Sequence, residues 1–449
     1  MTKQYDLIAI GSGTGASAAA AICRKAGWKV AVVDNLPFGG TCALRGCLPK
    51  KVLVGAAQAL DHSRRMRGRG IGGGELGIVW NELTEFKRTF TEPGPAMREA
   101  DYAKAGIDAH HGRARFRGPR SIEVGGELLE GRFVLVATGA VPMPLGIAGE
   151  EHLLTSTGFL ELGQLPKKIV FIGGGFIAAE FSHIAARAGA QVTVLERGER
   201  LLEPFDPDLV GWLMKKFLAL GIDVRLKTRV TAVARDGNGW VARASSNGGE
   251  EMFKAEVVVH AAGRIPDLES LDLAAAGVAS DNGRLKLNEF LQSVSNPAFY
   301  AAGDAAMNGP PLTPVANLDA EVAAANMLEG NHRKPDYLGI ASVCFTEPPI
   351  ASVGLSEAQA LANGLKFQVH CKNAADWYTA RRVAQTTYGF KVLVENATDR
   401  ILGAHLVGPN VDEVINIFAL AVRKGLTAQD VKTTLFAYPT GASDVGSML

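Results

Sequence analysis

The sequence predicts an α/β fold in which two strand–turn–helix–strand segments are followed by a C-terminal α+β region. Asp6–Asp34 runs from the strand DLIAIG through the glycine turn GSGTGA and an alanine-rich helix to the strand KVAVVD. Lys168–Glu196 repeats this design with KIVFIG, GGGFIA, AEFSHIAARAG and QVTVLE. β-branched strands that flank a helical period predict parallel βαβ units. From about Asp336 onward, the strands FKVLVE and ILGAHLVG alternate with the amphipathic helix DEVINIFALAVRKG.

The composition is that of a globular chain. Its 449 residues are enough for roughly two to four domains, and 47% of them are hydrophobic while 21% are charged. The net charge of +1 gives no reason to expect nucleic acid or an anionic membrane as a partner. No signal peptide and no apolar run of about 20 residues is recognisable. Five cysteines are too few for an extracellular disulfide framework, so we expect a cytoplasmic protein.

The first glycine turn carries a dinucleotide-binding fingerprint. Gly11 allows the tight turn, Gly13 allows close approach to a pyrophosphate, and Ala16 lets the helix pack on the strand. The N-terminus of the helix supplies free N–H groups to the phosphates. Asp34 follows about twenty residues later at a strand end, where a carboxylate binds ribose hydroxyls.

The second segment repeats the fingerprint with Gly173, Gly175 and Ala178, and Glu196 takes the place of the acid. A carboxylate there favours the ribose of NADH and repels the additional phosphate of NADPH. Arg197 is adjacent and would suit that phosphate. The sequence therefore favours NADH and leaves NADPH open.

Two cysteines stand five residues apart, Cys42 and Cys47, in the segment GGTCALRGCLPKK at Gly39–Lys51. On a regular helix their α-carbons would be too distant for a disulfide, which needs less than about 7 Å. Gly39 and Gly40 permit the distorted first turn that such a bridge requires. A helix start and the neighbouring Lys50 are expected to lower a thiol pKa and favour thiolate.

This segment strongly resembles the redox-active segment of the class I pyridine nucleotide-disulfide oxidoreductases, which include glutathione reductase, dihydrolipoamide dehydrogenase and mercuric reductase. The resemblance extends over nearly the whole chain. Its further motifs are GSGTGA, VATG at Val136–Gly139, GGGFIAAE, AAGRIPD at Ala261–Asp267, YAAGD at Tyr300–Asp304, LTPVA at Leu312–Ala316 and FTEPPIASVG.

The resemblance implies two Rossmann-like dinucleotide-binding domains and a C-terminal α+β dimerisation domain, in a homodimer whose C-terminal domain completes the partner's active site. The implied domains are 1–145 for FAD, 146–266 for NAD(P)H, 267–335 as a central domain completing the FAD site, and 336–449 as the interface domain. FAD and a nicotinamide nucleotide are the implied cofactors, and no metal site is expected.

The resemblance also assigns roles to single residues. Cys47 would face the flavin, Cys42 would meet the substrate, and Lys50 and Glu180 would lie beside the reactive nitrogen of the flavin. Phe176 would cover the flavin until the nicotinamide enters. The other implied cofactor-binding residues are Gly40, Thr41, Lys51, Thr138, Gly139, Gly263, Gly303, Asp304 and Thr313.

The C-terminus departs from the family pattern. Disulfide-reducing relatives carry a histidine–glutamate pair that moves protons at the outer thiol, whereas this chain reads YPTGAS, with Tyr438 and Ser443 at the two positions. A phenol with a pKa of about 10 is a poor base at neutral pH. Asp444 is one position away from the expected glutamate. Mercuric reductases also carry tyrosine there but end in a cysteine pair, and this chain ends in SDVGSML. The arginines that hold glutathione in relatives align with Ala21 and Glu321.

The leading hypothesis is an FAD-dependent NAD(P)H reductase that passes electrons through Cys42 and Cys47 to a small disulfide or thiophilic acceptor other than glutathione disulfide. One alternative is a quinone or dye reductase (a diaphorase) in which the flavin reduces the acceptor directly. Reduction of a metal, as in mercuric reductase but without its cysteine tail, is another. A non-catalytic FAD-binding redox sensor is the remaining alternative.

His110 and His111 fit a surface strand better than a metal site.

Overall fold

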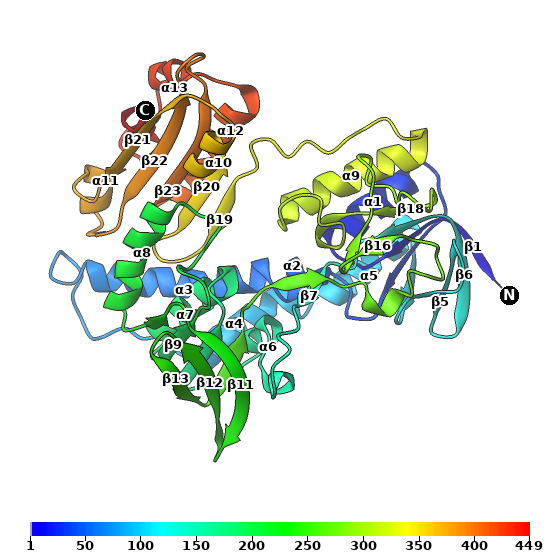
Figure 1. Ribbon diagram of the computed structural model, residues 1–449, viewed down its shortest axis with the longest axis horizontal. Helices are drawn as coiled ribbons and strands as arrows, with labels where there is room; N and C mark the ends of the chain where they lie inside the picture. Colours follow the sequence, from blue (N-terminus) through cyan, green and yellow to red (C-terminus); the bar gives the residue numbers. More distant parts are fainter. Residues whose placement is uncertain (1) are drawn as a thin grey trace. The chain divides into compact units, whose positions relative to one another are not determined.

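The computed structural model describes residues 2–449 (Figure 1). The chain divides into two compact units. Unit 1 comprises Met1–Lys50, Glu85–Met143 and Gly263–Tyr337, and unit 2 comprises Lys51–Thr84, Pro144–Ala262 and Leu338–Leu449. The four-domain division expected from the sequence stays a prediction.

Unit 1 is built around a seven-stranded sheet in the order β3-β2-β1-β6-β5-β4, with β18 also paired to β6. The pair β1–β2 is parallel, as predicted for the first βαβ segment. The pairs β2–β3, β1–β6 and β6–β18 are also parallel, and β5 joins β6 antiparallel. The strands are β1 Lys3–Ile10, β2 Val30–Asp34, β3 Asp108–His111, β4 Arg115–Phe116, β5 Ser121–Val124, β6 Glu127–Val136 and β18 Phe299–Ala301.

Two long helices, α1 Thr14–Lys25 and α9 Thr313–Glu329, lie side by side in unit 1 (Figure 1). Alanines make the close packing possible, because Ala20 of α1 and Ala323 of α9 are fully buried in one apolar cluster with Leu135 of β6. The N-termini of both helices thereby come to the ends of the parallel strands, where α/β proteins bind ligands.

Shorter elements complete unit 1. Within it, β7 Ala140–Pro142 pairs antiparallel with β15 Arg264–Pro266, and β16 Ser280–Asp281 pairs with β17 Arg284–Leu285. The remaining helices here are α2 Gly40–Leu44, α5 Gly94–Ala105, η2 Glu269–Leu271 and η3 Gly303–Ala305; α3 Cys47–Arg65 begins in this unit and α4 Trp80–Thr91 ends in it.

Unit 2 contains the second predicted βαβ segment as a parallel four-stranded sheet in the order β10-β9-β8-β14. A three-stranded antiparallel sheet, β11-β12-β13, belongs to the same unit. The elements are β8 Lys168–Ile172, α7 Phe176–Arg187, β9 Gln191–Leu195, α8 Pro207–Ala219, β10 Asp223–Arg225, β11 Arg229–Asp236, β12 Gly239–Ser246, β13 Gly249–Ala255, β14 Val257–His260 and the short α6 Ser156–Leu160.

The C-terminal part of unit 2 is a five-stranded antiparallel sheet in the order β19-β20-β23-β22-β21, with α12 Val411–Lys424 packed against it. The sheet contacts α8 directly, because a β-carbon on Gly389 of β22 would lie 2.2 Å from the ring of Trp212. The elements are β19 Ser342–Cys344, β20 Ile350–Gly354, α10 Glu357–Ala362, β21 Phe367–Asn373, α11 Tyr378–Arg381, β22 Gly389–Glu395, β23 Ile401–Val407 and α13 Ala428–Thr433.

The predicted fold class is confirmed by these sheets, two of them parallel around a βαβ segment and one antiparallel at the C-terminus. Among residues 2–449, none of the helices combines the length and the apolar character that a membrane crossing requires.

Candidate functional site

The first glycine turn, between β1 and α1, brings backbone against backbone. Gly11 has a φ of 108°, and a β-carbon there would lie 2.3 Å from the carbonyl oxygen of Ala137. Gly40 has a φ of 73°, and its β-carbon would lie 2.3 Å from the α-carbon of Gly13. Only glycine fits these positions. No side chain caps α1, so its first N–H groups remain available for an anion.

Asp34 ends β2 with a fixed carboxylate. Its Oδ2 accepts hydrogen bonds from the backbone N–H (2.8 Å) and the hydroxyl (2.6 Å) of Ser12, and its Oδ1 accepts one from the N–H of Leu36 (2.9 Å). The carboxylate is therefore oriented before any ligand arrives, at the place where the sequence predicts ribose binding.

These turns line one pocket of about 710 Å³ in unit 1, a volume within the range of about 300–1,000 Å³ that ligand sites occupy. In the described part of the chain, the hydroxyl of Thr138 is the buried side-chain polar atom that lacks a hydrogen-bond partner. An orphaned hydroxyl in a pocket wall indicates a polar ligand. The predicted residues found in this wall are Gly11, Gly13, Asp34, Gly40, Thr41, Cys42, Cys47, Thr138, Gly139, Gly303, Asp304 and Thr313.

The pocket also holds charged groups whose largest electrostatic influence is burial. Burial lowers the pKa of the Arg45 and Arg264 guanidinium groups and raises the pKa of the Asp267 and Asp304 carboxyl groups. Cations for a pyrophosphate and carboxylates for sugar hydroxyls are what a dinucleotide requires, so the residues present fit FAD. The sequence analysis missed Arg45, Arg264 and Asp267 as site residues, although each stands inside a recognised motif.

The cysteine segment is interrupted more sharply than the sequence predicts. Cys42 belongs to α2, and Cys47 opens a separate helix, α3. Gly46 lies between them, where a β-carbon would meet the Thr41 carbonyl oxygen at 3.0 Å. The break, rather than a single distorted turn, lets the two thiols come close enough for a hydrogen bond between them.

The expectation that the setting lowers a thiol pKa is wrong for Cys42. The hydrogen bond with Cys47 and then burial raise the pKa of Cys42, and they outweigh Thr313 and Lys50, which lower it. The sequence showed the cation but not the sulfur-to-sulfur contact.

The start of α9 lies beside the cysteines. The Thr313 hydroxyl is 3.6 Å from the sulfur of Cys47, so this residue contacts the redox pair as well as the pocket. Lys51 is not in the pocket wall, and its ammonium group lies 3.8 Å from the Phe345 ring centre and 3.5 Å from Asp412; its cofactor-binding role stays a prediction. Gly263 is also outside the wall, and its carbonyl accepts from the Met143 N–H at 3.1 Å.

The second glycine turn repeats the geometry of the first in unit 2. Gly173 has a φ of 107°, and a β-carbon there would lie 2.4 Å from the carbonyl oxygen of Ala261. Gly175 is the N-cap of α7 in extended conformation without a side-chain cap. Ala178 is fully buried where α7 packs on the sheet. The turn therefore presents helix N–H groups to a second anion.

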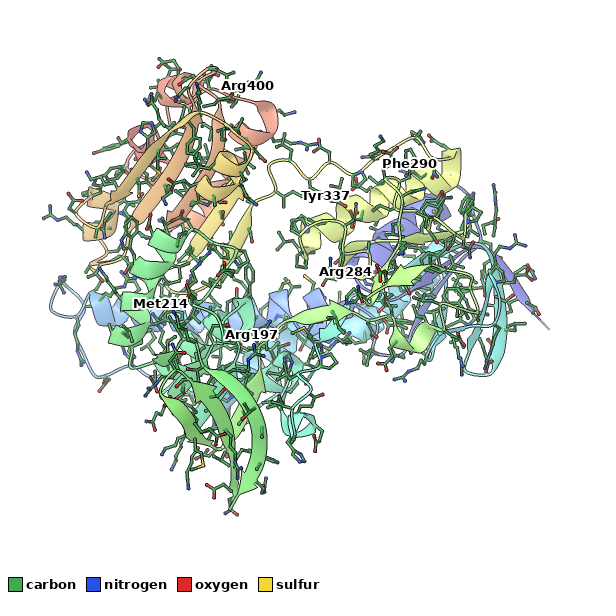
Figure 2. All side chains as sticks on the ribbon, in the orientation of Figure 1. Arg197, Met214, Arg284, Phe290, Tyr337 and Arg400 are labelled. Carbon is green, nitrogen blue, oxygen red and sulfur yellow. The ribbon has the colours of Figure 1, made fainter. Side chains whose placement is uncertain are left out.

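The acid of this second site lies over the glycine turn. Glu196 Oε1 accepts from the Gly198 N–H at 2.5 Å, and its Oε2 is 2.7 Å from where a Gly174 β-carbon would be. Arg197, labelled in Figure 2, is exposed. Arg200 nearby donates to the carbonyl oxygen of Phe205 at 2.6 Å.

The C-terminal motif has no proton relay of the family kind around Tyr438. The Tyr438 side chain is 84% exposed. Asp444, one position from the expected glutamate, instead accepts a hydrogen bond of 2.8 Å from the Tyr388 hydroxyl. Ser443 closes a capping box with Thr440. Both candidate partners of Tyr438 are thus committed to other contacts.

The vicinal histidines lie on β3 and each faces one carboxylate. His110 is 3.5 Å from Glu127 and His111 is 3.4 Å from Glu99. Neither carboxylate is adjacent to the histidines in the chain, so the sequence did not indicate these pairs. Within residues 2–449, no group of three or more potential metal ligands is found.

Comparisons with known proteins bear on the whole chain. Residues 5–320 match the family model described as pyridine nucleotide-disulphide oxidoreductase, and residues 340–448 match the dimerisation domain of that family. A glutathione reductase of Burkholderia cepacia is 32% identical over 98% of this chain and 97% of its own length. A mercuric reductase of Staphylococcus aureus is 34% identical over 98% of this chain and 80% of its own length.

Solved structures agree. The Cu(II) complex of the HOCl-induced flavoprotein disulfide reductase RclA from Escherichia coli superposes with a TM-score of 0.89 at 27% identity, and the match covers 100% of this chain and 99% of that one. The predicted family is therefore confirmed: the chain belongs to the class I pyridine nucleotide-disulphide oxidoreductases, a family of FAD-dependent enzymes that use NAD(P)H.

Proposed function

We propose that this enzyme oxidises NADH and passes two electrons through a Cys42–Cys47 disulfide to a thiophilic acceptor other than glutathione disulfide. The observation that carries the proposal is the joint position of both thiols in the wall of one dinucleotide-sized pocket. Their hydrogen-bond contact makes closure to a disulfide geometrically accessible.

Different residues of the pocket would bind different parts of FAD. The first glycine turn and Arg45 suit the pyrophosphate, while Asp34 and Asp304 suit sugar hydroxyls. FAD, when bound, supplies two-electron transfer between the nicotinamide and the cysteine pair. Two electrons and two protons open the disulfide to the dithiol, and delivery of both electrons to the acceptor closes it again.

NADH is the proposed reductant because Glu196 holds a carboxylate over the second glycine turn. The additional phosphate of NADPH would meet this charge. Among the neighbouring cations, Lys227 is paired with Glu199 at 2.8 Å and Arg200 with Glu203 at 3.2 Å. Arg197 is the cation at this position whose charge would oppose the preference.

The acceptor is proposed from what the C-terminal motif lacks. Tyr438 is a phenol in place of an imidazole, and Asp444 is bound to Tyr388, so the outer thiol has no strong base from this motif. A soft metal ion bound by two thiolates needs no such base. The Cu(II) complex of RclA and the mercuric reductases among the relatives support a metal acceptor, and a small disulfide is the other candidate.

Assembly and location are part of the same proposal. The match of residues 340–448 to a dimerisation domain supports a homodimer in which this domain completes the partner's site. A disulfide that opens and closes in catalysis is the kind found in the cytoplasm, which supports the cytoplasmic location expected from the sequence.

The test is a pair of cysteine variants in the purified holoenzyme. Cys42→Ser is expected to abolish turnover with mercuric ion, Cu(II) and lipoamide, because no disulfide remains to receive electrons. Cys371→Ser is the matched control: this exposed thiol lies on β21, and its loss should leave all rates unchanged. Anaerobic titration with NADH and then NADPH reads the nucleotide preference from the rate of flavin bleaching.

Unchanged turnover of the Cys42→Ser enzyme with every productive acceptor would contradict the proposal. That result would favour the diaphorase reading, in which quinones or dyes take electrons directly from the flavin. A flavin that NADH and NADPH both fail to bleach would overturn the reductase function as a whole.

A further inference from the structure

One face of α7 holds a short backbone segment of the C-terminal region, Phe345–Glu347. The Phe345 N–H donates to Glu180 Oε1 at 2.9 Å, and the Phe345 carbonyl oxygen lies 2.9 Å from His183 Nε2. Arg187 Nη2 donates to the carbonyl oxygen of Glu347 at 3.0 Å. Glu180, His183 and Arg187 are spaced so that they share one side of the helix.

Arg187 determines the tautomer of His183. Arg187 Nη1 lies 3.1 Å from His183 Nδ1, and a guanidinium group can only donate. Nδ1 must therefore accept, which leaves the proton on Nε2. The Nε2–H group then donates to the Phe345 carbonyl oxygen, and the imidazole is held neutral by its two neighbours.

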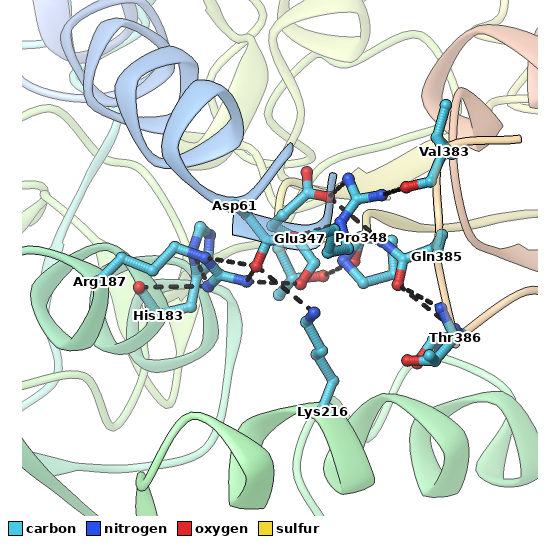
Figure 3. A network of polar contacts seen from close by, with 12 residues as sticks. Asp61, His183, Arg187, Lys216, Glu347, Pro348, Val383, Gln385 and Thr386 are labelled. Carbon is cyan, nitrogen blue, oxygen red and sulfur yellow. Dashed lines mark hydrogen bonds and ion pairs between the residues drawn. The ribbon is translucent and has the colours of Figure 1, made fainter. Parts of the chain in front are cut away.

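A buried ionic cluster holds Arg187 in turn (Figure 3). Asp61 of α3 accepts from Arg187 Nη2 at 2.8 Å and from Arg187 Nε at 3.2 Å. The same carboxylate pairs with Arg65 at 2.7 Å and Lys216 at 3.4 Å. His183 is 0% exposed, Arg187 2% and Asp61 5%, so each of these side chains has one environment and one direction.

We propose that His183 is a positioning residue for Glu180: by binding the Phe345 carbonyl oxygen it fixes the backbone of Phe345, so that the N–H of the same residue holds the Glu180 carboxylate in one orientation. Arg187 and Asp61 support this arrangement by fixing the ring of His183. The chain of contacts runs from Asp61 through Arg187 and His183 to the peptide and ends on Glu180.

The consequence for the reaction rests on the proposed function. It also rests on the role that the family resemblance implies for Glu180, beside the reactive nitrogen of the flavin, where the orientation of its carboxylate would bear on hydride delivery from the nicotinamide. A carboxylate that rotates freely would spend part of its time in unproductive geometries, which lowers the rate without lowering nucleotide affinity. The nucleotide itself is proposed to bind at the second glycine turn, one helical turn before Glu180.

A purely structural role makes a different prediction. If His183 only filled space, its replacement would affect stability but would leave the protection of the Phe345 amide and the split between rate and affinity unchanged. Hydrogen exchange of the Phe345 amide therefore separates the two roles, and it does so without reference to activity.

The experiment compares three holoenzyme variants. His183→Leu removes both ring nitrogens, and His183→Gln keeps a side-chain donor of similar reach. Ser182→Ala is the matched control, because Ser182 is fully buried on the same helix and its hydroxyl donates to the carbonyl oxygen of Ala179 within that helix. Hydrogen exchange followed by mass spectrometry is read in peptides that contain Phe345, and flavin reduction by NADH is followed anaerobically by stopped flow.

In the His183→Leu enzyme the Phe345 amide is expected to exchange roughly tenfold faster, the size expected when one buried hydrogen bond is lost. Flavin reduction should slow by a similar factor of about ten, with the NADH concentration at half-maximal rate changed by less than about twofold. His183→Gln should recover most of both effects, and Ser182→Ala should match the wild type in both measurements.

A protected Phe345 amide together with an unchanged rate in the His183→Leu enzyme would overturn the proposal. So would a slower rate in both His183 variants while the Phe345 amide stays protected. If His183→Leu does not fold, the His183→Gln enzyme decides by the same two readouts. Failure of NADH to reduce the wild-type flavin would contradict the proposed function alone, because the exchange measurement still tests the placement of Glu180.

Discussion

At the scale of single residues, Glu196 is the carboxylate on which the proposed preference for NADH depends. Its Oε1 is held by the Gly198 N–H and its Oε2 lies over Gly174, so the carboxylate has a fixed orientation over the second glycine turn. The type of residue was readable from the sequence, because the acid follows the fingerprint at the usual distance. The hydrogen bond that orients the carboxylate was not readable from the sequence, because it depends on the backbone conformation around Gly198.

Replacing Glu196 with serine is expected to shift the enzyme toward NADPH. Removal of the negative charge ends its repulsion of the additional phosphate and leaves Arg197 to attract it, so the ratio of kcat/KM for NADPH to that for NADH should rise by about tenfold or more. Steady-state kinetics with both nucleotides provides the measurement. Glu151→Gln, an exposed acid of the same unit, should leave the ratio unaltered, and an unaltered ratio in the Glu196 variant would refute the assignment.

At the scale of elements, the cysteine segment and the first glycine turn depend on each other. Gly40 opens α2 close to Gly13, whose α-carbon would lie 2.3 Å from a β-carbon at position 40, so the first glycine turn and the segment that carries Cys42 form one packed contact. The sequence predicted both elements and the need for glycine near the cysteines. It could not show that the two glycines meet, since they lie far apart in the chain.

Gly40→Ala is expected to yield protein that lacks FAD. A methyl group at that position would lie 2.3 Å from Gly13 and would also meet a φ of 73°, so the turn must move out of its phosphate-binding shape. The ratio of flavin absorbance to protein reports the loss. Gly27→Ala separates strain from collision, because Gly27 has a φ of 91° with nothing within 4 Å of its β-carbon; it should keep its FAD. Full FAD content in the Gly40 variant would contradict this prediction, because it would show that the backbone around Gly13 can move to admit the methyl group without losing FAD.

The sequence predicted those helices and strands whose hydrophobic period and glycine turns lie within one short segment of the chain. The two βαβ segments follow from strand and helix periods and are confirmed as β1–α1–β2 and β8–α7–β9 with parallel pairing. The break between α2 and α3, the thiol contact that raises the pKa of Cys42, and the bond from Tyr388 to Asp444 were beyond the sequence. Each is a contact set by tertiary packing, which no local pattern encodes.

At the scale of the whole molecule, the buried cluster around Glu347 links folding stability to pH. Burial, and then the negative charge of Asp61, raise the pKa of the Glu347 carboxyl to about 7, although Arg187, Arg65 and Lys216 act in the opposite direction. The pKa of Asp61 is lowered to about 2 by these cations against the cost of its own burial. The two carboxylates of one cluster thus respond to opposite ends of the acid range.

The stability contributed by Glu347 is expected to fall as pH rises. The folded protein holds the proton of Glu347 up to about pH 7, whereas the unfolded chain releases it near pH 4.5, so folding is favoured by this group below 4.5 and loses that contribution between 4.5 and 7. The loss amounts to roughly 3 kcal/mol at about 1.4 kcal/mol per unit. Glu347→Gln removes the titration, so its melting temperature relative to the wild type should rise from pH 5 to pH 8.

Thermal melts of both proteins across this pH range provide the comparison, with Glu151→Gln as an exposed acid that should track the wild type throughout. A constant difference between the Glu347 variant and the wild type would mean that Glu347 does not change its protonation over the range. Asp61 adds nothing to this window, because its contribution is lost only as pH falls from 3.8 towards 2.

The contact between Gly389 and Trp212 limits how independent the C-terminal sheet can be. The indole ring lies 2.2 Å from where a β-carbon at position 389 would be, and Cys344, Ile350 and Val407 of the sheet share one apolar cluster with Leu209 and Leu213 of α8. A fragment that kept the sheet without α8 would expose this apolar surface to water.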